Sequence, residues 1–173
     1  FTATPTNGAA PLSVTFTNTS TGTITNSFWS FGDNVTSNTS LAPLTHTYTT
    51  AGTYNVSLTV RGPVGVSTTN RPGLIVVVRP PLLVITPNGL DYGAVTIGQT
   101  NTLAFSVINP GDLPLTGTVS TLPPFAIDGD GAYTVPPGET RTVMVSFIPT
   151  TKGTTNGAAL FDSNGGILTG SLL

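Results

Sequence analysis

Apolar side chains recur at every second position along much of this chain. The alternation is clearest over residues 12–16, 54–60, 103–107 and 143–147. A period of two places these side chains on one face of a β-strand, whereas an amphipathic helix needs a period near 3.6. No stretch of the sequence has a convincing helical period. The pattern therefore predicts an all-β protein.

Turn-forming sequences separate these segments. They include Gly32-Asp33-Asn34, Ala51-Gly52-Thr53, Asn109-Pro110-Gly111-Asp112, Pro136-Pro137-Gly138 and Asn164-Gly165-Gly166. Short alternating strands separated by such turns are typical of β-sandwiches. The Pro80-Pro81 pair cannot donate ladder hydrogen bonds and favours a stiff, extended connection. We therefore predict two tandem sandwiches, residues 1–79 and 82–173, joined by a linker at 80–81.

Composition narrows the class of protein. Only 7% of residues are charged and the net charge is −2, so no field attracts nucleic acid. The absence of cysteine excludes a disulfide framework and thiolate metal sites, and no apolar run is long enough to insert into a membrane. Because the chain starts at Phe1 rather than Met, we expect it to be a piece of a longer polypeptide.

The first half carries a series of motifs in order: Gly8-x-Ala10-Pro11-Leu12-x-Val14-x-Phe16, Trp29-Ser30-Phe31-Gly32-Asp33-Asn34, His46-Thr47-Tyr48 and Ala51-Gly52-Thr53-Tyr54-Asn55-Val56. It resembles a PKD domain, an Ig-like sandwich. The resemblance covers nearly all of residues 1–79. The family commonly has Asp-Phe-Gly-Asp-Gly where this chain has Ser30 and Asn34 as the outer members, so no cation site is carried over.

The same residues predict a core. Trp29 lies where an Ig-type sandwich has its strand C tryptophan, and Tyr54 follows a glycine-containing corner, as in a tyrosine corner. Val14 and Val56 occupy the positions of the Ig cysteines. We expect Val14, Trp29 and Val56 to form one buried contact, with Tyr54 beside it.

The second half has Leu90-Asp91-Tyr92-Gly93, Phe105-x-Val107-x-Asn109-x-Gly111, Pro137-Gly138-Glu139 and Val145-Ser146-Phe147-x-Pro149. It is similar to ASH or Hydin-like Ig domains, which include "choice-of-anchor" modules of bacterial surface proteins. Phe105 and Phe147 are predicted core residues. Both resemblances imply scaffold, spacer and adhesion modules, and neither implies a catalytic set.

Candidate chemistry is sparse. We interpret His46, the only histidine, as a structural strand residue, because it has no partner groups in the sequence for a metal or nucleophilic site. Asp33 is expected to cap backbone amides in its turn. Asp128 and Asp130 are candidate calcium ligands, but the remainder of a calcium loop is missing. We therefore expect no cofactor, no metal and no enzyme activity.

Four Asn-x-Ser/Thr sequences, at Asn18, Asn34, Asn38 and Asn55, are candidate glycan attachment sites and favour an extracellular or cell-surface location. The sequence favours a structural, adhesive and protein-binding module that associates with copies of itself or with neighbouring domains in a filament, surface layer or stalk. Exposed edges are expected at Thr45–Thr49 and Ile167–Leu173, because lysine, which usually protects edges, occurs once. The alternative is an accessory module that holds polysaccharide or fibrous substrate for a secreted hydrolase.

Overall fold

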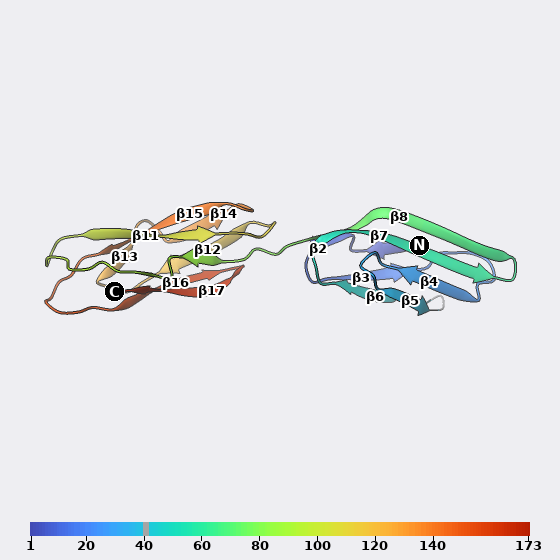
Figure 1. Cartoon of the computed structure of the whole chain (residues 1–173), viewed down its shortest axis with the longest axis horizontal. Coiled ribbons are helices and arrows are strands. Elements are labelled where there is room, and N and C mark those ends of the chain that lie inside the picture. Colours follow the sequence, from blue (N-terminus) through green and yellow to red (C-terminus); the bar gives the residue numbers. More distant parts are fainter. Residues whose placement is uncertain (40–41) are drawn as a thin grey trace. The chain divides into compact units, whose positions relative to one another are not determined.

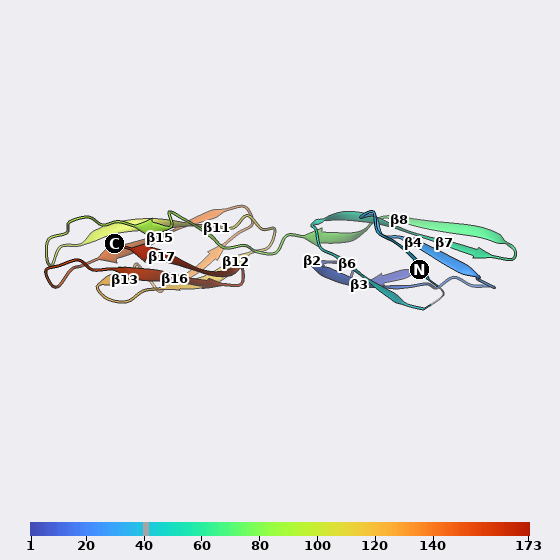
Figure 2. The same cartoon turned by 60° about the horizontal axis from the view of Figure 1, so that its bottom comes forward.

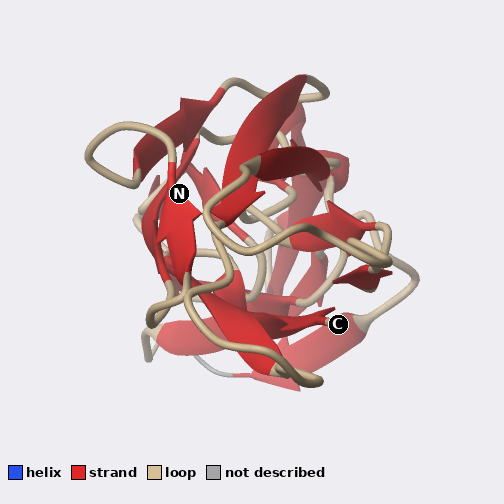
Figure 3. Ribbon diagram, turned by 90° about the vertical axis from the view of Figure 1, so that its left-hand side faces the viewer, coloured by secondary structure: helices blue, strands red, loops and turns tan. Residues whose placement is uncertain are grey.

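The chain folds into two compact units, Phe1–Arg79 and Pro80–Leu173. The computed structural model describes residues 1–39 and 42–173. Within these ranges the regular structure is β-strand and no helix occurs, as Figure 3 shows. The all-β prediction is confirmed.

The first unit contains two sheets (Figure 1). Its strands are β1 (Thr2–Thr4), β2 (Asn7–Ala9), β3 (Leu12–Thr17), β4 (Asn26–Ser30), β5 (Thr36–Thr39), β6 (Leu44–Tyr48), β7 (Gly52–Gly62) and β8 (Gly65–Val78). One sheet has the order β1-β3-β6, and the other has the order β2-β8-β7-β4-β5. All neighbours are antiparallel except β2 and β8, which run parallel over three residue pairs.

The inward faces of these sheets form one core. Along β3, Leu12, Val14 and Phe16 are buried while the residues between them are exposed, as the period of two predicts. The core also contains Trp29, Phe31, Tyr48, Val56, Leu58, Ile75 and Val77. Five aromatic rings, those of Phe1, Phe16, Trp29, Phe31 and Tyr48, are therefore buried in this core.

The second unit also contains two sheets (Figure 2). Its strands are β9 (Val84–Thr86), β10 (Gly89–Leu90), β11 (Asn101–Ile108), β12 (Leu115–Ser120), β13 (Phe125–Ile127), β14 (Ala132–Val135), β15 (Thr140–Phe147), β16 (Gly157–Ser163) and β17 (Gly166–Leu172). The sheet orders are β13-β15-β11-β9 and β10-β17-β16-β12-β14.

A separate core holds the second unit together. Phe105, Phe125, Phe147, Phe161 and Tyr92 are buried in it with surrounding aliphatic side chains. The Phe105 and Phe161 rings meet edge to face at 5.3 Å, a favourable aromatic geometry. Each unit therefore has its own apolar core.

Candidate functional site

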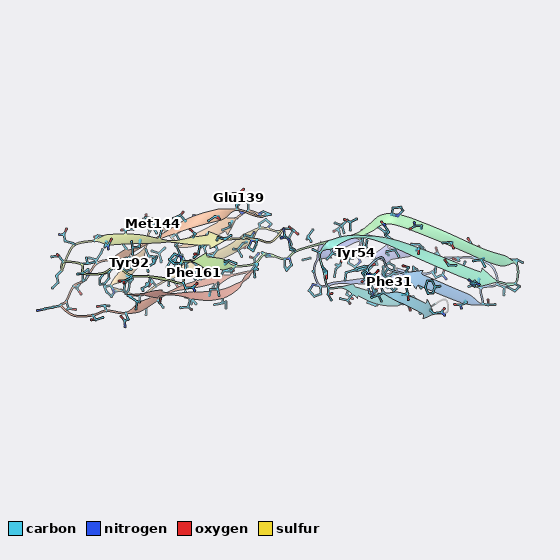
Figure 4. All side chains as sticks on the ribbon, viewed as in Figure 1. Phe31, Tyr54, Tyr92, Glu139, Met144 and Phe161 are labelled. Carbon is cyan, nitrogen blue, oxygen red and sulfur yellow. The ribbon has the colours of Figure 1, made fainter. Side chains whose placement is uncertain are left out.

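The predicted core residues of the first unit lie together. Val14 and Val56 are fully buried and Trp29 is 1% exposed, all in one cluster. Tyr54 is half-buried at the margin of this cluster, and its hydroxyl donates to the Thr50 carbonyl oxygen at 2.6 Å. This bond to upstream backbone is the one expected of a tyrosine corner. Figure 4 labels Tyr54 and the buried Phe31 in this unit.

His46 has a partner that the sequence did not reveal. Its Nε2 lies 2.7 Å from Asp33 Oδ2, its ring stacks on Phe31 at 4.2 Å, and the edge of Tyr48 contacts it at 4.6 Å. Asp33 Oδ1 accepts a hydrogen bond from the Val35 amide, so the expected capping is present. The pair joins the turn after β4 to β6. The expectation that His46 lacks a partner group is therefore wrong, while its placement on a strand is confirmed.

This pair has the chemistry of a structural contact. A general base needs a ring nitrogen within hydrogen-bond reach of its substrate. Nε2 of His46 instead lies against Asp33, its ring packs on Phe31 and Tyr48, and its side chain is only 12% exposed. Tyr48 donates its hydroxyl to the Phe31 carbonyl oxygen at 3.0 Å. Burial raises the pKa of Tyr48 well above its usual range, and the charge of Asp33 raises it further. Tyr48 is therefore held as a neutral hydrogen-bond donor.

The acidic loop of the second unit contains the two candidate calcium ligands, Asp128 and Asp130. Asp130 Oδ1 accepts a hydrogen bond from the Ala132 amide at 3.0 Å. Arg141 lines the same surface hollow as Asp128 and Asp130. Within residues 1–39 and 42–173, no group of three or more His, Asp or Glu side chains is placed to hold a metal ion.

Asn109 is a buried polar residue whose role the sequence did not reveal. It is fully buried. Its Nδ2 donates to the carbonyl oxygens of Leu113 and Val135, and its Oδ1 accepts from the Gly111 amide at 3.0 Å and the Leu82 amide at 3.4 Å. One side chain thus satisfies backbone groups from three segments. The predicted core residues of this unit, Phe105 and Phe147, are buried.

Open strand edges are the main unpartnered backbone feature. β8 pairs with β7 along its length, but β2 covers only Val76–Val78 of its other edge. Residues 65–73 are all exposed, and residues 65–70 carry no charge. Of the edges expected from the sequence, β6 pairs with β3 alone among the described strands, whereas β10 pairs with Ser171 and Leu172 of β17. The sequence missed β8 because its exposed part lacks alternation.

The outer face of the β5-β4-β7-β8 sheet carries an exposed aromatic ring. Phe28 is 46% exposed because its neighbours Ser27 and Trp29 both face the core. It lines a hollow of about 340 Å³ with Asn26, Asn38, Thr59 and Arg61. The inward Trp29 and the period of two were enough to predict that Phe28 points outward.

The candidate glycan sites differ in access. Asn34, Asn38 and Asn55 are exposed, although Asn55 Oδ1 accepts a hydrogen bond from the Gly73 amide. Asn18 is half-buried, and its Nδ2 donates to the buried Ser27 hydroxyl at 3.0 Å. A glycan on Asn18 Nδ2 therefore requires this bond to break. The third residue of the Asn38 sequence, Ser40, lies outside the described residues.

Among the described residues there is no helix that is long and apolar enough to cross a membrane.

Two family models match the chain in succession. Residues 2–76 match the model of the PKD domain, and residues 81–170 match the model of the HYDIN/CFA65/VesB-like Ig-like domain. A search of the curated proteins gives no match. The order and the identity of the two predicted domains are confirmed.

The chain is similar to several solved structures, at low identity and low TM-score. The ASH/PapD-like domain 7 of human CEP192 is 15% identical, with 54% of this chain and 83% of that chain covered and a TM-score of 0.42. A protein of unknown function from Porphyromonas gingivalis W83 is 14% identical, with 92% and 89% covered and a TM-score of 0.47. Fibronectin(III)-like modules of Clostridium thermocellum CbhA are 12% identical, with 96% and 86% covered and a TM-score of 0.31.

Proposed function

The chain belongs to the HYDIN/CFA65/VesB-like Ig-like family through residues 81–170, which follow a PKD domain at residues 2–76. We propose a function for the chain on this basis. Domains of these two kinds are generally non-catalytic. The chain acts as a structural and protein-binding module of a secreted or cell-surface protein. Its partners are copies of itself or neighbouring domains in a filament, surface layer or stalk.

The open edge of β8 carries this proposal. Soluble monomers protect strand edges with lysine, proline, bulges or covering loops, because free N–H and C=O groups pair with other strands. Arg71 and Pro72 protect one end of this edge, but residues 65–70 have the uncharged sequence Gly-Val-Ser-Thr-Thr-Asn. A strand from another chain therefore has about six residues of free ladder to pair with, by β-augmentation.

Paired proline substitutions test the edge. The two-residue turn between Gly62 and Gly65 makes these two residues a hydrogen-bonded pair. Because the hydrogen-bonding direction of the amides alternates along an antiparallel strand, the Ser67 and Thr69 amides point toward β7 and the Thr68 amide points outward. Thr68→Pro should keep the folded hairpin and weaken self-association in sedimentation velocity by about tenfold or more, since it blocks the outer ladder. Thr69→Pro, the matched control, should destabilise the hairpin itself. Unchanged association of a folded Thr68→Pro chain would contradict pairing at this edge.

The alternative function, an accessory module that holds polysaccharide or fibrous substrate for a secreted hydrolase, is supported by one observation. Phe28 lies exposed among amide, hydroxyl and guanidinium side chains, a combination that stacks on and hydrogen-bonds to sugar rings. Co-sedimentation with insoluble polysaccharides tests it. Binding that Phe28→Ala abolishes would favour this alternative over assembly, and no binding to any polysaccharide would count against it.

A further inference from the structure

The few charges of this chain are divided unequally between its two units. The first unit has three arginines and one aspartate, which gives +2 with His46 neutral. The second has five aspartates and one glutamate against Arg141 and Lys152, which gives −4. When two copies meet, contact between unlike units is attractive, whereas contact between like units is repulsive.

Two β-hairpins, one in each unit, have the same layout near their turns. In the β7-β8 hairpin, the pair Gly62–Gly65 closes the turn and Arg61 pairs with Val66 next to it. In the β16-β17 hairpin, the pair Ser163–Gly166 closes the turn and Asp162 pairs with Ile167 next to it. Arg61 and Asp162 thus occupy equivalent positions with opposite charge.

Exposed apolar side chains flank both charges on the outer faces of their sheets. Val66, the direct partner of Arg61, is 60% exposed, and Phe28 lies opposite Thr59, two residues before Arg61. Ile167, the direct partner of Asp162, is 64% exposed, and Leu160 lies two residues before Asp162 on the same face. We call these the arginine tip (Phe28, Arg61, Val66) and the aspartate tip (Leu160, Asp162, Ile167).

Neither charge forms an ion pair with another described residue. In the described part of the molecule, Arg61 has no carboxylate within 4 Å and Asp162 has no cationic group within 4 Å. The backbone carbonyl of Arg61 accepts from Thr25, which fixes the strand at this point. Each tip therefore presents one free charge beside two exposed apolar side chains on a fixed hairpin.

We propose that the aspartate tip of one copy docks on the arginine tip of a second copy, with Arg61 paired to Asp162 and the four apolar side chains packed around them. This inference rests on the proposed self-association. The contact is heterologous, because it joins different surfaces of the two copies, and heterologous contacts build rings or open filaments rather than closed dimers. Two arginine tips or two aspartate tips repel each other, so the contact also sets the direction of assembly.

A charge exchange in the full chain tests this pairing. Arg61→Glu and Asp162→Arg should each reduce association in sedimentation velocity by about tenfold, because each places like charges in the contact. The double variant Arg61→Glu/Asp162→Arg restores opposite charges and should recover association. The control Arg61→Glu/Glu139→Arg has the same net charge, but Glu139 directly precedes β15, which belongs to the other sheet of the second unit from the β16-β17 hairpin. This control should not recover association.

The outcomes separate the two proposals. Recovery in the exchange variant alone supports the tip-to-tip contact. Equal recovery in both double variants shows that only net charge matters and overturns it. If all variants associate like the unmodified chain, the contact is wrong while self-association stands. If the unmodified chain stays monomeric, self-association fails first. Melting curves of each variant show whether a loss of association comes from unfolding.

Discussion

Asn109 is a buried residue whose side chain bonds to several backbone groups of the second unit. An alanine there leaves the carbonyl oxygens of Leu113 and Val135 and the amide of Gly111 without their buried partner. Because each unsatisfied buried group costs about 1–3 kcal/mol, Asn109→Ala should lower the free energy of unfolding by about 3 kcal/mol or more. Urea titration of the second unit's signals measures this. Asn88→Ala, at an exposed position of the same unit, is the control, and an equally small effect of both substitutions would contradict this role of Asn109.

Burial also affects individual tyrosines, most measurably Tyr92. Its hydroxyl donates to the Val145 carbonyl oxygen at 2.8 Å, and burial raises its pKa to about 12. The unfolded chain releases this proton near pH 10, so the folded chain binds it more tightly between about pH 10 and 12. The contribution of Tyr92 to stability is therefore complete below this window and lost as the pH rises through it.

Tyr92→Phe removes this titration. The variant should start less stable, because it lacks the bond to Val145, but its urea midpoint should fall less steeply above about pH 10 than that of the unmodified chain. Near neutral pH the two midpoints should change in parallel. Parallel slopes in the alkaline window as well would show that Tyr92 does not cause the alkaline loss of stability.

Among the elements, alternation predicted the regular strands, but it did not predict the irregular strands or the contacts between distant segments. Val14, Phe105 and Val145 face the cores as the period of two requires. The alternation did not predict the long exposed part of β8 or the two-residue β10, because neither has an alternating pattern. The Asp33–His46 pair was not predicted for another reason. It joins a turn to a strand 13 residues away, and a periodic pattern in the sequence does not indicate such a contact.

Gly117 on β12 shows a close approach between elements. A Cβ at this position would lie 2.3 Å from the Asp162 carbonyl oxygen and 2.8 Å from the Tyr133 hydroxyl, which is buried beneath the strand. Gly117→Ala should therefore shift backbone and cost about 1–3 kcal/mol by overpacking. Gly129→Ala does not serve as a control because its φ of +91° disfavours a side chain. Ala132→Gly, on the exposed face of β14, should cost less, and thermal melting compares the two.

On the scale of the whole molecule, two separate cores predict two separable unfolding events. Val56 is fully buried in the first core, so Val56→Asp places an unpaired charge there and should cost several kcal/mol. Trp29, the only tryptophan, reports on the first unit alone. Its fluorescence should become that of an unfolded chain, while the near-UV signal from Tyr92 and Tyr133 remains. Loss of both signals together would contradict independent cores.

Low charge and open strand edges together account for the proposed assembly. Only 7% of residues are charged, so little repulsion opposes contact, and the unequal division of charge gives that contact a direction. The β8 edge supplies backbone partners and the two tips supply a charged pair with apolar neighbours. The two family models describe single domains and do not predict how copies associate. The proposed assembly is therefore argued from residues on exposed faces and not from the fold class.

Self-association of the unmodified chain is measured by sedimentation velocity over a wide concentration range and at low and high salt. We expect species larger than one chain that grow with concentration and diminish with salt, because salt screens the contact between unlike units. A single species of 17.6 kDa at every concentration and salt level would contradict it.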